Sequence, residues 1–277
     1  MKLLALVMML AAAASANAQT YSALQSGGSQ SNTISESQLR LSKVSLLTVR
    51  VRKEWIFKNG KFDWTFVDQC RARCIKTGDR FLLLVIGGFV KDPFIESELQ
   101  WWEAMYASAG AKYRNDPYCA GVHCTGATLD TPSEWQWPTI TTRTELGTQR
   151  IIRACHAGFP DKPIYWGAHG SNWNSQIRII KYGVNRVKPG LWFVGHNSLK
   201  SSTSLASGHN QIVVEAAKLG SGMWFQMVCS ARDDPGRFGS RNVMDGAAQA
   251  FRLADQARYP RAGLVFEIYK SDLADLR

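Results

Sequence analysis

Carboxylates and tryptophans recur in this sequence near the ends of buried apolar runs. Glu267 lies at the end of one run, and Glu134 follows another with Trp135 and Trp137 beside it. Two carboxylates that flank a glycosidic bond can supply the acid and the nucleophile, or the acid and the base, of its hydrolysis. Aromatic rings combine a large apolar face with low conformational freedom, so they can stack on the C–H face of a sugar ring. These residue types favour chemistry on carbohydrates.

Other chemistries have less support in the sequence. It contains no phosphate-binding G-x-x-x-x-G-K-[ST] or G-x-G-x-x-G loop, no H-E-x-x-H and no G-x-S-x-G. No Cys/His cluster has the spacing of a zinc site. His123, His169 and His196 near strand ends are the one feature in favour of a metal, and each is more readily explained as a hydrogen-bonded polar group. We therefore expect neither a metal nor another cofactor.

Short apolar runs alternate with amphipathic stretches, and this pattern indicates parallel strands joined by right-handed helical crossovers. The near-continuous apolar character of the runs is typical of a sheet buried on both faces. We expect an α/β fold, a (β/α)8 TIM-type barrel, which needs eight strands. The sequence contains seven candidate strands, so the first strand of the barrel is hidden in the N-terminal leader, or is missing or irregular. The predicted strands are Leu46–Val51, Phe81–Ile86, Ala120–Cys124, Ile164–Trp166, Leu191–Val194, Met223–Val228 and Leu264–Ile268.

Helical spacing of apolar residues predicts the crossovers between these strands. Ser35 is a suitable N-cap for a further short helix that extends to Ser42. The helical stretches are Phe66–Cys74, Leu99–Lys112, Leu146–Cys155, Ile212–Leu219 and Ala247–Ala257.

The active site of a parallel barrel lies at the C-terminal ends of its strands. Glu134 and Glu267 are the catalytic candidates under this rule, with Glu134 as general acid/base, its pKa raised by aromatic neighbours. A structural salt bridge with Arg50 or Arg52 is the rival explanation for Glu267, and core packing is the rival for each tryptophan. The expected substrate-binding residues are Arg52, Trp55, His123, Trp166, His196, Asn197, Gln226 and Tyr269.

The N-terminal residues predict export. Lys2 precedes an apolar stretch, and Ala16-Asn17-Ala18 matches an A-x-A cleavage pattern. We expect a signal peptide over residues 1–18, a flexible leader over 19–34 and the barrel domain over 35–277, in a secreted or periplasmic protein. No later segment approaches the roughly 18 apolar residues of a membrane span.

The chain has a formal net charge of +11 and six cysteines. Its Lys and Arg residues are scattered and accompany no nucleic-acid motif, so we expect no nucleic-acid partner. A basic surface that binds anionic polymers stays open as a weaker hypothesis. The cysteines are either disulfide-bonded or buried thiols, and the sequence does not decide between these states.

The stretch from Arg50 to Trp55, followed by Gly60 to Trp64, resembles the R-x-x-W … G-x-[FY]-D-W stretch of clan A barrel glycoside hydrolases. This clan includes β-galactosidases and cellulases. Ala111 to Pro117, followed by Gly121 to Gly126, is similar to its passage into strand four. The resemblance covers about Ser35 to Asp272 and makes the seven runs strands two to eight.

The resemblance implies a role for several of these positions. Strand four leads to the acid/base Glu, for which Ser133-Glu134 is the nearest match, and Arg50 or Arg52 matches the Arg that orders the nucleophile. At strand seven the clan has a nucleophilic Glu, whereas this chain has Gln226, and an amide cannot be a nucleophile.

Three outcomes follow from this departure at strand seven. Glu267 takes the role of the second carboxylate, or Asp233 or Asp234 does, or hydrolysis has been lost and sugar binding persists. The expected function is thus a secreted glycosidase with a carbohydrate substrate, and the alternative is an inactive carbohydrate-binding barrel.

Overall fold

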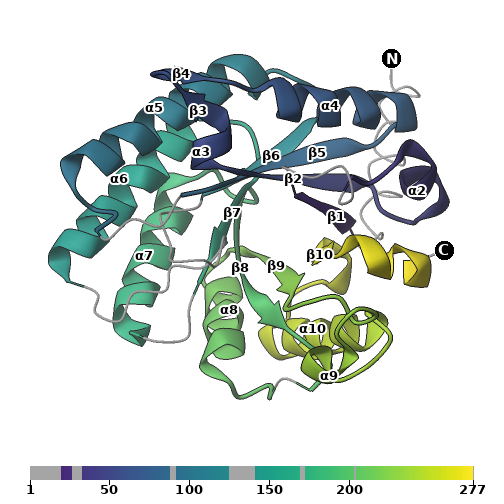
Figure 1. The fold of residues 1–277 in the computed structure, drawn as a ribbon. Coiled ribbons are helices and arrows are strands. Elements are labelled where there is room, and N and C mark those ends of the chain that lie inside the picture. The colour runs from purple at the N-terminus through teal and green to yellow at the C-terminus, as the bar shows by residue number, and fades with distance from the viewer. Residues whose placement is uncertain are drawn as a thin grey trace, which may run out of the picture.

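The computed structural model describes residues 20–26, 33–87, 92–124, 141–168, 172–202 and 204–276. Eight parallel strands form a closed barrel with helices around it (Figure 1). The predicted (β/α)8 TIM-type fold is confirmed, and each of the seven expected apolar runs is a barrel strand. In order around the barrel the strands are β1 (Thr20–Ser26), β2 (Leu46–Arg52), β5 (Arg80–Ile86), β6 (Cys119–His123), β7 (Ile164–Gly167), β8 (Trp192–Leu199), β9 (Gly222–Met227) and β10 (Val265–Ile268).

The first strand lies inside the segment expected to be a flexible leader. That expectation is wrong for Thr20–Ser26, which pair in parallel with both β10 and β2 and close the barrel. Tyr21 and Ala23 belong to the core between barrel and helices, whereas Ser22 faces the barrel interior. Because the polar residues Thr20 and Ser22 share the inward face, the strand lacks the continuous apolar character of the other seven. The predicted signal peptide lies outside the described residues.

Helices cover the outside of the barrel. Ser35 caps the first of them as expected, since its side chain accepts a hydrogen bond from the backbone N–H of Gln38. Helix α7 was not among the predicted stretches, although two neighbouring parallel strands require a crossover. The helices are α2 (Glu36–Leu41), α4 (Thr65–Thr77), α5 (Glu96–Tyr113), α6 (Thr142–Gly158), α7 (Trp173–Arg186), α8 (Gly208–Lys218) and α10 (Met244–Ala257).

Short elements decorate this frame. They are the helices α3 (Lys53–Ile56) and α9 (Pro235–Phe238), the hairpin β3 (Phe57–Lys58) and β4 (Lys61–Phe62), and the 3-10 helices η2 (Arg261–Gly263) and η3 (Lys270–Leu276). No helix within the described ranges is long and apolar enough to cross a membrane. All six cysteines are buried free thiols.

The barrel interior has an apolar layer and a polar layer. Leu46, Leu82, Tyr165, Trp224 and Val265 form an apolar cluster separate from the core under the helices. Two residues farther along their strands, toward the C-terminal ends, the inward positions are polar: Thr48 on β2, Gln226 on β9 and Glu267 on β10. We call the end of the barrel that the C-terminal ends of the strands form the mouth. The polar layer lies between the apolar cluster and the mouth.

Candidate functional site

Glu267 and His123 form the centre of the polar layer. The Glu267 side chain is 1% exposed, and its Oε1 lies 2.6 Å from Nε2 of His123. The same Oε1 accepts a hydrogen bond from Thr48 Oγ1 at 2.9 Å. Strands β6 and β10 stand on opposite sides of the barrel, so the two side chains meet across its interior. The carboxylate is therefore held from two directions, by Thr48 and by His123.

One atom of each central side chain is buried without a hydrogen-bond partner among the described residues: Oε2 of Glu267 and Nδ1 of His123. Buried polar atoms are nearly always paired, and leaving one unpaired costs about 1–3 kcal/mol. Oε2 can accept a hydrogen bond or attack an electrophile. Nδ1 can accept a hydrogen bond when Nε2 donates to Glu267. Each of the two buried side chains thus keeps one hydrogen-bonding atom that no described residue satisfies.

Aromatic rings fix the orientation of His123. Its ring centroid lies 5.3 Å from that of Tyr165 and 5.0 Å from that of Trp224, with the Trp224 ring nearly perpendicular. Trp224 is itself held by a 3.0 Å hydrogen bond from its Nε1 to the carbonyl oxygen of Trp166. Burial raises the pKa of Tyr165, and the negative charge of Glu267 raises it further. The surroundings of the Glu267–His123 pair are therefore rigid and shielded from water.

A chain of hydroxyl groups supports the carboxylate. Ser22 on β1 lies 2.7 Å from Thr48, whose hydroxyl donates to Glu267. Neither residue stands out in the sequence as a candidate. Ser22 falls in the supposed leader, and Thr48 lies within an apolar run. Strand alternation could have identified Thr48. Thr48 lies two residues before Arg50 on β2 and therefore shares a face with it, and Arg50 is a candidate for ordering the nucleophile.

Gln226 and Tyr269 lie beside Glu267. Gln226 is buried on β9, the seventh strand of the barrel, and pairs in register with Glu267 on β10. Tyr269 follows β10 and is half-buried. Burial raises its pKa, while the positive charge of Arg50 opposes the rise, so the phenol and the guanidinium are electrostatic neighbours. The structure thus brings together four residues that the sequence suggested for the site: Glu267, His123, Gln226 and Tyr269.

Two of the expected binding residues face away from the barrel interior. Trp166 is fully buried under the helices, where it stacks on Trp192 at 6.2 Å. His196 Nε2 lies 2.8 Å from Oδ1 of Asn210 on α8. Neither side chain therefore points toward the Glu267 cluster, because successive strand residues point to opposite faces. Their neighbours on the other face, Tyr165 and Gly195, are the inward ones.

Three other expected residues lie near the mouth but outside the Glu267 cluster. Arg52 ends β2, and its guanidinium lies 5.5 Å from the ring centroid of Trp55 and 3.7 Å from Glu54. Trp55 lines a hollow of about 450 Å³ between α3 and α4, which shares no lining residue with the Glu267 cluster. Asn197, near the end of β8, accepts a hydrogen bond from Ser198 at 3.2 Å.

Glu134 and His169 lie outside the described residues. Within the described ranges no group of three or more His, Cys, Asp or Glu side chains could hold a metal ion.

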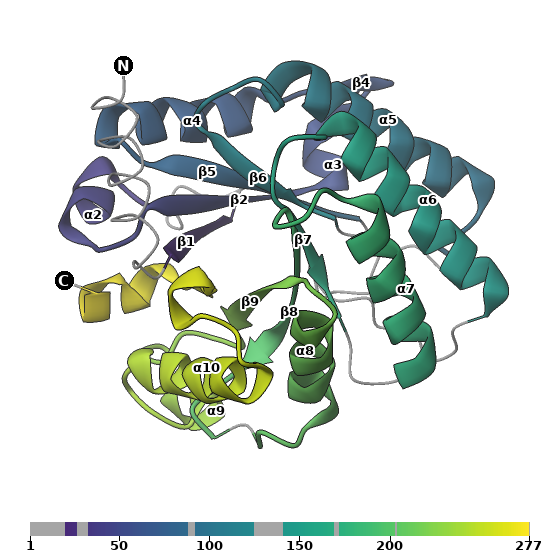
Figure 2. The same cartoon turned by 180° about the vertical axis from the view of Figure 1, so that it is seen from behind.

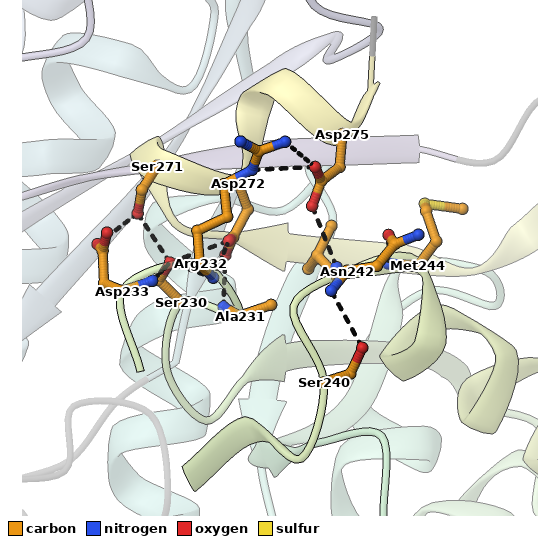
Figure 3. Close-up of polar contacts among 11 residues, drawn as sticks. Ser230, Ala231, Arg232, Asp233, Ser240, Asn242, Met244, Ser271, Asp272 and Asp275 are labelled. Atoms are coloured by element: carbon orange, nitrogen blue, oxygen red, sulfur yellow. Dashed lines mark hydrogen bonds and ion pairs between the residues drawn. The ribbon is translucent and has the colours of Figure 1, made fainter. Parts of the chain in front are cut away.

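The loop after β9 contains Asp233 and Asp234, the other carboxylates considered for catalysis. Asp233 accepts a 2.5 Å hydrogen bond from Ser271, and Asp234 caps α9 through the backbone N–H of Arg237 (Figure 3 shows the Ser271 contact). These contacts give both carboxylates structural roles at the rim of the mouth. In the described part of the chain neither one contacts Glu267.

Buried Asp272 on η3 anchors the same loop. Its carboxylate accepts hydrogen bonds from the Ser230 hydroxyl at 2.9 Å and from the backbone N–H groups of Ala231 and Arg232 at 3.2 and 3.1 Å (Figure 3). Asp275 binds the guanidinium of the same Arg232. The C-terminal segment thus fixes the loop that follows Gln226.

No family model matches the chain, and no curated protein matches it in sequence. Solved structures do match. A psychrophilic family 10 endo-β-1,4-xylanase superposes with a TM-score of 0.56 at 11% identity, over 91% of this chain and 86% of the xylanase. The catalytic domain of an endoglucanase from Thermobifida fusca gives 0.56 at 11% identity, over 90% and 78%. A family 39 glycoside hydrolase from Bacteroides cellulosilyticus gives 0.56 at 11% identity, over 91% of this chain and 57% of that one. The chain has the barrel fold of clan A glycoside hydrolases, as the sequence resemblance implied.

Proposed function

We propose that this protein is a glycoside hydrolase that cleaves O-glycosidic bonds in an oligo- or polysaccharide, with Glu267 as one of two catalytic carboxylates. The observation that carries the proposal is the buried Glu267–His123 pair below the barrel mouth, with Oε2 of the carboxylate unpaired. The fold it shares with a xylanase and an endoglucanase supports the same activity. Trp173 at the start of α7 is 37% exposed and offers a ring for sugar stacking.

The contacts of Glu267 suggest how it acts. Thr48 and His123 both engage Oε1, which orients the carboxylate and leaves Oε2 to meet the substrate. Glu134, which follows strand β6, is the proposed general acid. The distance between the two carboxylates decides the stereochemistry: about 5–5.5 Å gives retention, and about 6.5–9.5 Å leaves room for a water and gives inversion.

A hydrolysis screen of the purified protein on aryl glycosides, xylan, glucan and galactan tests this proposal. Glu267→Gln and Glu134→Gln accompany the wild type, with Glu215→Gln on α8 as a matched surface control. We expect turnover in the wild type and the control, and its loss in both site variants with retained circular dichroism. Full activity in Glu267→Gln would refute the assignment of this carboxylate.

Gln226 favours a second candidate function, a carbohydrate-binding barrel without hydrolysis. It occupies strand seven, where the clan resemblance places the nucleophilic carboxylate, and an amide cannot attack the anomeric carbon. Saturable binding of an oligosaccharide by isothermal titration calorimetry, together with no turnover in the screen, would establish this second function in place of the first.

We also propose that the protein is exported through a signal peptide over residues 1–18. Cleavage after Ala18 would leave all eight strands in the mature chain, because β1 begins at Thr20. Mass spectrometry of the protein after expression in a secreting host tests the proposal. A mature N-terminus at Gln19 supports it, and an intact Met1 in the recovered protein contradicts it.

A further inference from the structure

The outer surface between α5 and α6 carries a groove that hydrolysis does not use. The two helices run side by side (Figure 2). Hollows of about 510 and 460 Å³ lie along their seam and share Arg150 and Arg153. We call the two hollows together the arginine groove, since Arg114, Arg150, Arg153 and Arg186 line the first and Arg143, Arg150 and Arg153 line the second. None of its lining residues belongs to the polar layer of the barrel.

Small residues form the floor of the groove. Gly110 on α5 and Gly158 on α6 touch so closely that a Cβ on Gly110 would lie 2.4 Å from the carbonyl oxygen of Gly158. Alanines continue the floor on both helices at Ala107, Ala111, Ala154 and Ala157. Because these side chains end at Cβ, the longer arginines stand as the walls.

The charge of the groove is only partly neutralised. Arg150 forms ion pairs with Glu96 and Glu103 at 2.7 and 2.6 Å, so it has a structural role. Arg114, Arg153 and Arg186 are exposed, and none of them forms an ion pair with a carboxylate of the described residues. Three guanidinium groups therefore share one concave surface.

We propose that the arginine groove binds a chain of an acidic polysaccharide, whose carboxylates pair with Arg114, Arg153 and Arg186. Guanidinium groups bind carboxylates through two parallel hydrogen bonds. The groove follows α6 from Leu146 to Gly158, about 18 Å at 1.5 Å per residue, which suits a polymer better than a single anion.

A single-stranded nucleic acid fits this surface less well. Such a strand is usually held by stacking its bases on exposed aromatic rings. Among the described residues that line the two hollows, Phe94 is the one aromatic ring, and it is 7% exposed. The groove thus offers charge and hydrogen bonds without a stacking platform.

Binding of polygalacturonate, measured by affinity electrophoresis and biolayer interferometry, tests the proposal. The site variant replaces Arg114, Arg153 and Arg186 by Gln. The control variant replaces Arg241, Arg252 and Arg258 by Gln, which removes the same charge from exposed positions around α10. A neutral glucan and oligo(dT) serve as comparison ligands, and unfolding curves verify that both variants are folded.

We expect the site variant to lose at least about tenfold in affinity for polygalacturonate while the control stays within about twofold, because only the site variant removes the guanidinium groups that pair with the polymer. Wild-type binding should weaken about a hundredfold for a tenfold rise in salt. Equal losses in both variants would mean that overall charge alone attracts the polymer, and would overturn the proposal. So would tighter, groove-dependent binding of oligo(dT), or no binding of polygalacturonate. These outcomes do not depend on hydrolysis, so they leave the proposed activity untouched.

Discussion

His123 on β6 and Glu267 on β10 project from opposite sides of the barrel and meet at 2.6 Å in its interior. These strands are the fourth and eighth of the barrel and are not neighbours in the sheet. The contact between the two side chains therefore joins strands that share no backbone hydrogen bonds. The pair therefore links the two halves of the barrel at the level of the proposed site.

Replacing His123 by Ala should destabilise the protein by about 3–5 kcal/mol, because the buried carboxylate of Glu267 loses a charged or hydrogen-bonding partner. Urea unfolding measures the change. A double variant, His123→Ala with Glu267→Gln, should recover part of the loss, since it no longer leaves a buried charge. If the two single losses simply add in the double variant, the pair is not coupled and this interpretation fails.

Replacing Gln226 by Glu tests the inactive-barrel alternative. The new carboxylate would sit in register beside Glu267 on the neighbouring strand. Repulsion between two buried carboxylates raises one of the two pKa values, so one of the pair should keep a proton near neutral pH. If the wild type is inactive because of the amide, turnover on aryl glycosides should appear. A variant less active than the wild type would instead assign Gln226 a positioning role.

Replacing Asp272 by Ala should loosen the loop after β9. The buried backbone N–H of Ala231 would lose its acceptor, which costs about 1–3 kcal/mol, and the N–H of Arg232 would keep only the Ser230 hydroxyl. We expect faster hydrogen exchange at these two amides. Asp255→Ala, which removes an exposed carboxylate paired with Arg261, is the control and should change stability by less than about 1 kcal/mol. Unchanged exchange in the Asp272 variant would contradict an anchoring role.

Replacing Gly158 by Ala should separate α5 from α6. A Cβ at this position would lie 2.5 Å from the carbonyl oxygen of Tyr106, which is backbone and cannot move away cheaply. Overpacking of this kind costs about 1–3 kcal/mol, seen as a lower midpoint of thermal unfolding. Gly236→Ala, where the nearest atom is 4.0 Å away, is the matched control. Equal midpoints for the two variants would show that the helices adjust freely.

His156 on α6 should make stability depend on pH. Burial lowers its pKa, and the positive charges of Arg186 and Lys188 lower it further. The folded state therefore disfavours the proton that the unfolded chain accepts near pH 6.5. Above that pH this histidine has no effect on the free energy of unfolding. As pH falls below the pKa of the unfolded chain toward the lower pKa of the folded one, the free energy of unfolding decreases and the protein becomes less stable. NMR titration of the imidazole should show Arg186→Gln raising this pKa, and no change would contradict the electrostatic cause.

Strand periodicity explains both the successes and the errors of the sequence analysis. Seven strands were predictable because most of their residues are apolar on both faces, under the helices and inside the barrel. β1 was not, since its inward positions carry residues such as Ser22. The strand-end rule selected Glu267 and His123, which the structure brings into contact. It also selected Trp166 and His196, which face away from the barrel interior, because the rule gives the end of a strand and not the face. Counting alternate residues from Tyr165 and Gly195 would have excluded both.

The seam between β1 and β10 joins the first and last strands of the sheet, and the bond from Thr48 to Glu267 next to it spans 219 positions of the chain. During synthesis, a chain that extends only through β9 already contains Ser22, Thr48 and His123 but lacks the carboxylate that they hold. Contacts between distant segments form late in folding because the intervening loop must first be closed. The proposed carboxylate lies on β10, so a chain that ends before this strand lacks the functional centre.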